Sequence, residues 1–153
     1  SIISALNSFG IIHTEPVTIT TTTAAHLGDL TRTMGVVDYV SPEPYEAIEV
    51  VSPKAKRIRS NGFNDLFDTL TPILDRDSTL YLYRNDEAES KNLLVFGDSC
   101  FASYKTPELL AENFSRLVFV SSYAISDDVV ELVKPDVIIF EITERDIDKL
   151  AIE

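Results

Sequence analysis

The stretch Leu93-Leu94-Val95-Phe96-Gly97-Asp98-Ser99 decides the fold class of this chain. Four consecutive apolar residues before a glycine predict a strand that is buried on both faces, as strands of parallel sheets are. Two similar runs follow at 117–120 and 136–140, and segments with helical spacing separate the three runs. Alternating strands and helices indicate an α/β fold with a parallel sheet. We therefore expect adjacent, parallel strands at about 93–97, 117–121 and 136–141.

The segments around these strands carry start and stop signals. Pro107 fits the first turn of a helix, where the missing N–H costs nothing. Ser126 is placed to cap a helix that stops at Pro135. Upstream, the β-branched run 17–23 predicts a strand or an extended segment, and the basic cluster 54–59 predicts a solvated strand or turn.

The composition is that of a folded domain with an acidic surface. Of the 153 residues, 44% are hydrophobic, and 25 acidic against 13 basic side chains give a net charge of −12. A surface of this sign repels phosphate backbones, so nucleic acid is not an expected partner. The length suits one domain, and no apolar run is long enough to span a bilayer.

Ser99 is the residue whose position suggests chemistry. Ligands of open α/β sheets bind beyond the carboxyl ends of the strands, and Ser99 follows such a strand directly. Gly97 would let the chain bend sharply, and backbone N–H groups of the turn could face a developing oxyanion. A Ser or Asp that caps a following helix produces the same tripeptide, so both interpretations stand at this point.

The blocks around this serine resemble those of SGNH hydrolases. Leu93–Phe101 is similar to that superfamily's first block, Gly-Asp-Ser followed by an apolar residue. Pro107–Phe119 and Lys134–Arg145 are similar to segments of its alginate O-acetyltransferase subgroup, and Gly28–Gly35 resembles a Gly-Asp-Leu element of the same proteins. The resemblance implies a three-layer, flavodoxin-like α/β fold. It also implies transfer or removal of O-acetyl groups on an exported polysaccharide, through an acyl ester on Ser99.

The family pattern includes a base that this sequence does not show. Family members activate the serine with an Asp-x-His pair before the Gly-Asp-Leu element, and neither His13 nor His26 stands in such a context. The opening helix over 2–9 resembles the helix that follows this pair. We therefore expect 1–153 to be a single SGNH-like domain whose N-terminal portion, with the base, is missing. Without a base the serine is a weak nucleophile, so these residues alone should be nearly inactive.

Three further residues are candidates for binding substrate or supporting the site. Asp98 would orient the turn or accept backbone N–H bonds for structural reasons. Tyr123 would line the crevice. Arg145 would point into the crevice or form a buried ion pair with Glu141 or Glu144.

No metal or cofactor is expected from the sequence. It contains neither metal-ligand spacing nor a phosphate-binding glycine loop. Its one cysteine, Cys100, excludes an intrachain disulfide and is interpreted as a small apolar residue.

The expected partners also follow from the resemblance. They are an exported polysaccharide and an acyl donor, in the periplasm or outside the cell. Because a missing N-terminal portion would bare a sheet edge, we also expect self-association or an extra strand from residues 16–23. Two other classes stay open: a catalytically inactive glycan-binding module, and a protein-interaction α/β domain in which Ser99 caps a helix.

Overall fold

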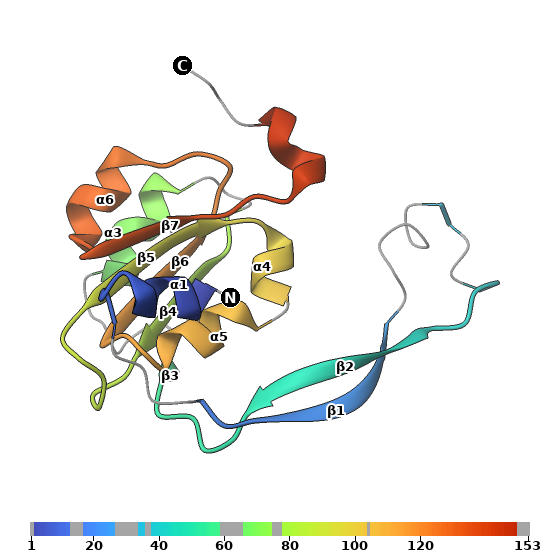
Figure 1. The fold of residues 1–153 in the computed structure, drawn as a ribbon. Helices are drawn as coiled ribbons and strands as arrows, with labels where there is room; N and C mark the ends of the chain where they lie inside the picture. Colours follow the sequence, from blue (N-terminus) through green and yellow to red (C-terminus); the bar gives the residue numbers. More distant parts are fainter. Residues whose placement is uncertain are drawn as a thin grey trace. The chain divides into compact units, whose positions relative to one another are not determined.

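The computed structural model describes residues 2–12, 17–26, 34–35, 38–58, 66–74, 78–103 and 105–149, without the side chains of His26, Arg145 and Lys149. The chain divides into two compact units, Ser1–Val17 with Ser52–Glu153, and Thr18–Val51. The first unit holds a five-stranded sheet with helices, and the second holds a two-stranded sheet (Figure 1).

A mixed sheet with the strand order β3-β4-β6-β5-β7 forms the centre of the larger unit. Its strands are β3 (Lys56–Ile58), β4 (Leu80–Arg84), β5 (Asn92–Gly97), β6 (Arg116–Ser121) and β7 (Val137–Phe140). β5 pairs in parallel with β6 on one side and with β7 on the other, which confirms the three adjacent parallel strands. β4 and β3 continue the sheet with antiparallel pairing.

Side chains of β5 alternate between two apolar cores, because successive residues of a strand point to opposite faces of the sheet. Leu93 and Val95 belong to the first core, and Leu94 and Phe96 to the second. All four are fully buried. The wholly apolar run therefore has the physical cause that was predicted for it, burial of both faces.

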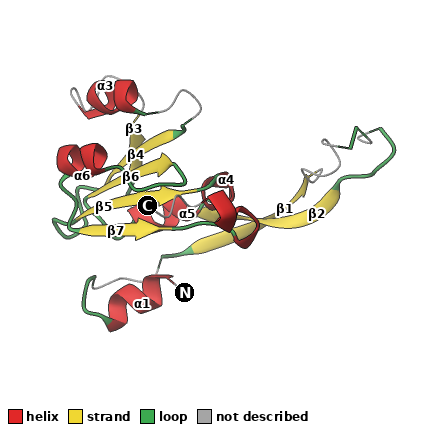
Figure 2. Cartoon of the chain, turned by 90° about the horizontal axis from the view of Figure 1, so that it is seen from above, coloured by secondary structure: helices red, strands yellow, loops and turns green. Residues whose placement is uncertain are grey.

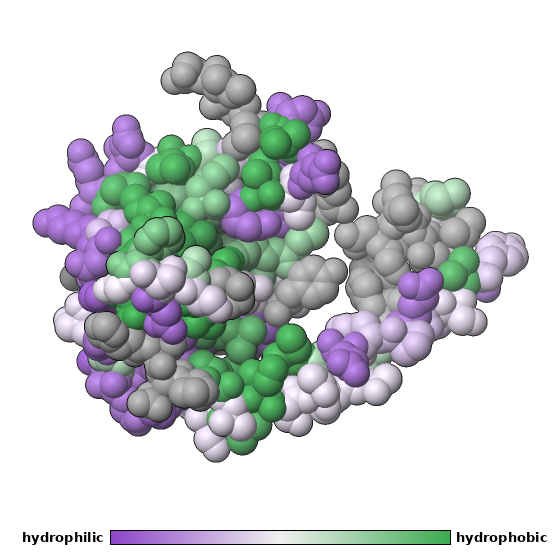
Figure 3. Space-filling view, in the orientation of Figure 1, coloured by the Kyte–Doolittle hydropathy of each residue, from purple (hydrophilic) through white to green (hydrophobic). Residues whose placement is uncertain are grey.

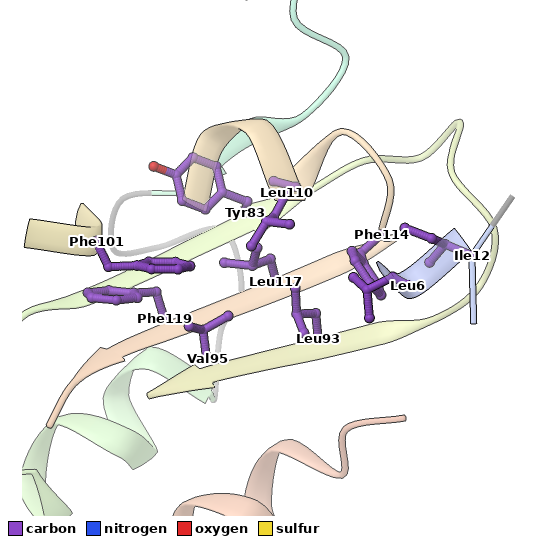
Figure 4. Close-up of a cluster of buried hydrophobic side chains, with 11 residues drawn as sticks. Leu6, Ile12, Tyr83, Leu93, Val95, Phe101, Leu110, Phe114, Leu117 and Phe119 are labelled. Carbon is purple, nitrogen blue, oxygen red and sulfur yellow. The ribbon is translucent and has the colours of Figure 1, made fainter. Parts of the chain in front are cut away.

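Helices cover both faces of the sheet and give the unit three layers (Figure 2). They are α1 (Ile2–Ser8), α3 (Leu66–Leu70), α4 (Ser99–Ser103), α5 (Thr106–Ala111) and α6 (Asp127–Val133). Leu6 of α1, Phe101 of α4 and Leu110 of α5 pack in the first core (Figure 4). Leu70 of α3 and Val129 of α6 pack in the second. The predicted three-layer α/β class is confirmed.

The helix ends follow local signals. Ser126 Oγ accepts the N–H of Val129 at 3.4 Å at the start of α6. That helix ends at Lys134, a left-handed residue with φ 48°. A 3-10 helix, η2 (Glu144–Lys149), follows β7, and a 3-10 turn, η1 (Thr71–Ile73), follows α3. None of the described helices is long and apolar enough to cross a membrane.

β7 forms one edge of the larger sheet and leaves apolar surface around it. Ile138 of β7 is 42% exposed and Leu132 of α6 is 41% exposed. Figure 3 shows hydrophobic surface over the region of β7 and α6. This is the kind of surface that the expectation of self-association requires. Self-association itself stays a prediction.

The smaller unit is an antiparallel pair of β1 (Ile19–His26) and β2 (Glu43–Val50). The strand predicted near 17–23 is thus present. It pairs with β2 and not with the five-stranded sheet, so the expectation that residues 16–23 extend that sheet is wrong. β1 instead pairs with β2 along its whole length, from Ile19 opposite Val50 to His26 opposite Glu43, in a sheet of its own.

Candidate functional site

Three parallel strands end at the same edge of the sheet, and the residues after them form the candidate site. β5 ends at Gly97, β6 at Ser121 and β7 at Phe140. Ser99 lies just beyond β5, as the first residue of α4, and is exposed. The predicted position of Ser99 beyond the carboxyl ends of these strands is confirmed.

Gly97 lies where a side chain has no room. A Cβ atom at this position would lie 3.2 Å from Phe119 Cε2 and 3.3 Å from Glu141 Oε2. Phe119 is fully buried and stacks on Phe101 and Tyr81, so its ring cannot withdraw without disturbing the core. The glycine was predicted to permit a sharp bend. The structure gives a different reason, close packing, since Gly97 is not among the residues with positive φ.

Asp98 is buried and joins two loops of the site. Its Oδ1 accepts the backbone N–H groups of Cys100 at 2.7 Å and Phe101 at 3.2 Å, so Asp98 caps α4. Its Oδ2 accepts the N–H of Thr143 at 3.0 Å, in the loop after β7. Asp98 therefore makes the backbone hydrogen bonds that the sequence allowed for it, and these bonds also fix the turn that carries Ser99.

Hydrogen bonds decide the ionisation of Asp98. Burial alone would raise the pKa of this carboxyl group. The hydrogen bonds from Thr143, Phe101 and Cys100 outweigh burial and hold the pKa below its usual value, because they stabilise the charged form. Asp98 is therefore a carboxylate at neutral pH.

The cap limits which N–H groups of the turn can stabilise an oxyanion. The N–H groups of Cys100 and Phe101 already donate to Asp98. The expectation that several amides of the turn face a developing oxyanion is corrected accordingly. The N–H of Ser99 has no partner within the part of the chain that the structure describes, and neither has its hydroxyl group.

Glu141 belongs to the site, although the sequence suggested it only as a partner of Arg145. Its N–H donates to Phe96 O at 2.8 Å and so continues the pairing of β5 with β7. Its Oε2 accepts the N–H of Asp98 at 3.4 Å. Burial, and then the charge of Asp98, raise the pKa of Glu141. The available signal was a glutamate directly after an apolar parallel strand, at the end of the sheet where Ser99 lies.

Thr143 is held in turn by Asp146. The hydroxyl of Thr143 donates to Asp146 Oδ2 at 3.1 Å, and the N–H of Asp146 donates to Thr143 O at 2.9 Å. Asp146 is buried. This turn at the start of η2 points the N–H of Thr143 at Asp98, so a chain of hydrogen bonds connects η2 to the serine turn.

The other predicted site residues are less completely described. Tyr123 lies beyond the end of β6 and is 37% exposed, at the same edge as Ser99. The side chains of Arg145 and His26 lie outside the description, and so do His13 and most of the Gly28–Gly35 element. The roles suggested for these residues stay predictions. No group of three or more His, Cys, Asp or Glu side chains in the described ranges is arranged to hold a metal ion.

A polar cleft of about 410 Å³ lies at the opposite end of the parallel strands. Its walls include Arg84 at the end of β4, Asn92 at the start of β5 and Arg116 at the start of β6. Protein groups already occupy much of this wall, since Arg84 pairs with Asp86 and the guanidinium of Arg116 donates to Val133 O. The cleft is separate from the Ser99 turn.

Solved structures share this fold. PatB1 of Bacillus cereus with a sulfonyl adduct matches with a TM-score of 0.60 at 12% identity, over 95% of this chain and 54% of that one. A DHHW family protein from Eubacterium siraeum matches with a TM-score of 0.55 at 12% identity, over 90% of this chain and 52% of that one. Another structure of Bacillus cereus PatB1 matches with a TM-score of 0.51 at 12% identity, over 95% of this chain and 56% of that one.

These likenesses concern the fold. The chain spans about half the length of the solved proteins that it matches. No protein-family profile matches the sequence, and no curated protein matches it.

Proposed function

We propose that Ser99 is the nucleophile of a polysaccharide O-acetyltransferase or acetylesterase, with an exopolysaccharide of the alginate kind as acceptor or substrate. The hydroxyl oxygen attacks the carbonyl carbon of an acetyl donor, its proton passes to a base, and the donor's leaving group departs. The product is an acetyl ester on Ser99. A sugar hydroxyl then takes the acetyl group in a transferase, and water takes it in an esterase.

The observation that carries this proposal is the position of Ser99. It is exposed, lies beyond β5 at the edge where β6 and β7 also end, and follows the residue that caps α4. The fold match to PatB1 with a sulfonyl adduct supports the proposal. A sulfonyl adduct arises when a nucleophilic side chain displaces the leaving group of a sulfonyl reagent, so that protein holds a reactive nucleophile.

The base in this proposal is the histidine of an Asp-x-His pair that precedes residue 1 in the complete open reading frame. The N–H of Ser99 is the proposed oxyanion donor, and Tyr123 and Arg145 are the proposed substrate contacts. Residues 1–153 would then be part of one SGNH-like domain that acts in the periplasm or outside the cell.

Acetylation of the serine tests the proposal directly. The protein expressed from the complete open reading frame is incubated with 4-nitrophenyl acetate, digested and analysed by mass spectrometry. We expect one acetyl group on the peptide that contains Ser99, and none after Ser99→Ala. Ser103→Ala, at the exposed end of the same helix, is the matched control and should keep the label. Unchanged turnover in a folded Ser99→Ala protein would rule out the nucleophile.

A binding module without catalysis is the second candidate function. The cap that Asp98 makes on α4 favours it, because this cap and the close packing at Gly97 give two of the three residues of the turn a structural role that needs no catalysis. Such a module would bind a glycan or a protein at the same edge of the sheet. An open reading frame without an upstream Asp-x-His pair, together with no acetylation of Ser99, would decide for this candidate.

A further inference from the structure

We infer that Glu141 is a positioning residue of the serine turn: its carboxylate holds the N–H of Asp98, fills the space beside Gly97, and so sets where the Ser99 hydroxyl lies. This inference rests on the function proposed for Ser99 and adds to it a residue outside the Gly-Asp-Ser motif.

Glu141 is attached to the β5 segment at two points. Its backbone N–H donates to Phe96 O at 2.8 Å, and its Oε2 accepts the N–H of Asp98 at 3.4 Å. The two bonds hold the chain on either side of Gly97. The next peptide unit contains the N–H of Ser99, the proposed oxyanion donor, so a shift of the Asp98 amide would move both reacting elements of the serine.

The space beside Gly97 is matched to this carboxylate. A Cβ atom at Gly97 would come within 3.3 Å of Glu141 Oε2. A side chain there would crowd the carboxylate that accepts the Asp98 N–H. The glycine and the glutamate therefore depend on each other, although Gly97 ends β5 and Glu141 follows β7.

The charges around Glu141 make its hold on the turn sensitive to pH. Within the described ranges, the ionisable group that acts on it is Asp98, which is a carboxylate and is bound in turn by the N–H of Thr143. Among the described side chains, no basic group forms an ion pair with Glu141. Loss of the proton makes Glu141 a stronger hydrogen-bond acceptor but also adds repulsion from the Asp98 carboxylate, so the geometry of the turn should change as Glu141 ionises.

Two substitutions separate the parts of this role. Glu141→Gln keeps an amide oxygen and nearly the same volume but cannot titrate. Glu141→Ala removes the acceptor altogether. In the protein from the complete open reading frame, we expect Glu141→Ala to lower kcat for 4-nitrophenyl acetate by about 10- to 100-fold with little change in KM, because misplaced reacting groups cost this much. In the unsubstituted protein, kcat should change with pH around a midpoint above the usual glutamate pKa. Glu141→Gln should keep most of kcat and should not show this change.

The second readout does not depend on catalysis. The amide proton shift of Asp98, followed by NMR as a function of pH, should titrate with a midpoint above the usual value for glutamate. This titration should vanish in Glu141→Gln and persist in Glu131→Gln, the same change at an exposed position of α6. A titration that survives in Glu141→Gln, or a Glu141→Ala enzyme with unchanged kcat and pH profile, would overturn the inference. If Ser99 is never acetylated, the proposed function fails, while the Asp98 titration still decides whether Glu141 holds the turn.

Discussion

The carboxylate of Asp98 accepts the backbone N–H of Thr143 at 3.0 Å and so joins the turn after β5 to the loop after β7. The same side chain caps α4 through its other oxygen. One buried carboxylate thus binds two of the three loops that follow the parallel strands, and its loss should lower the stability of the fold.

Substitution of Asp98 should measure this double role. Asp98→Ala removes the cap and leaves the N–H of Thr143 unpaired, so the free energy of unfolding should fall by about 2 kcal/mol. Asp98→Asn should lose less, because the amide oxygen can still cap α4 while the amide nitrogen cannot accept from Thr143. Urea unfolding compares the three proteins. Equal stability of Asp98→Ala and the unsubstituted protein would contradict the assigned hydrogen bonds.

The same carboxylate should shape the acid side of the stability profile. The pKa of Asp98 is lower in the folded than in the unfolded chain, so its contribution is present above about pH 3.9 and is lost as pH falls through the folded value. Asp98→Asn should therefore flatten the loss of stability in acid. The measurement is the urea midpoint at a series of pH values. If stability falls equally steeply in acid in Asp98→Asn, groups other than Asp98 cause that loss of stability.

Glu141 should change the pH dependence of stability in the direction opposite to that of Asp98. Its pKa is higher in the folded chain, so its contribution is present at low pH and is lost as pH rises through the folded value. Glu141→Gln should therefore gain stability over the unsubstituted protein at neutral pH and lose that gain in acid. The same series of urea midpoints measures it, with Glu131→Gln as the exposed control. A gain that does not depend on pH would contradict the assigned pKa shift.

Gly97→Ala should be destabilising because of crowding. The new methyl group would lie 3.2 Å from Phe119 Cε2, and we expect a loss of about 1–3 kcal/mol. A double-mutant cycle with Phe119→Leu gives the test, since a smaller side chain at 119 should relieve part of the crowding. Effects of the two substitutions that simply add would show that the phenylalanine is not the cause.

Lys134→Gly should stabilise the chain. Lys134 ends α6 with φ 48°, a conformation that a Cβ atom disfavours and that glycine adopts freely. The expected gain is about 0.5–1 kcal/mol. Lys134→Ala is the matched control, because it removes the same charge and keeps the Cβ atom. Thermal unfolding should rank glycine above alanine, and the reverse order would contradict the strained cap.

The sequence predicted those parts of the fold that depend on local patterns. The apolar run of β5 and the cap at Ser126 each carry their own signal within a few residues. The alternation of polar and apolar residues over 79–83 is typical of a strand but does not give its direction, because a period of two is the same in parallel and antiparallel pairs. The antiparallel β4 therefore appears only in the structure.

The site was predictable only where it follows from a strand end. Ser99 could be placed because it follows β5 directly. The roles of Gly97 and Glu141 could not be predicted, because each depends on a contact between segments that are far apart in the sequence. Phe119 meets Gly97 from β6, and Glu141 meets Asp98 only because Phe96 of β5 lies opposite Phe140 of β7. No spacing within one segment encodes such a register.

The most direct test of the central claim, that Ser99 is a reactive nucleophile, is its modification by phenylmethylsulfonyl fluoride. The protein from the complete open reading frame should gain one sulfonyl group, and peptide mapping should locate that group on Ser99. Ser99→Ala and residues 1–153 alone should stay unmodified while folded, since one lacks the nucleophile and the other lacks the proposed base. A folded complete protein that remains unlabelled at Ser99, or is labelled at another residue, would contradict the claim.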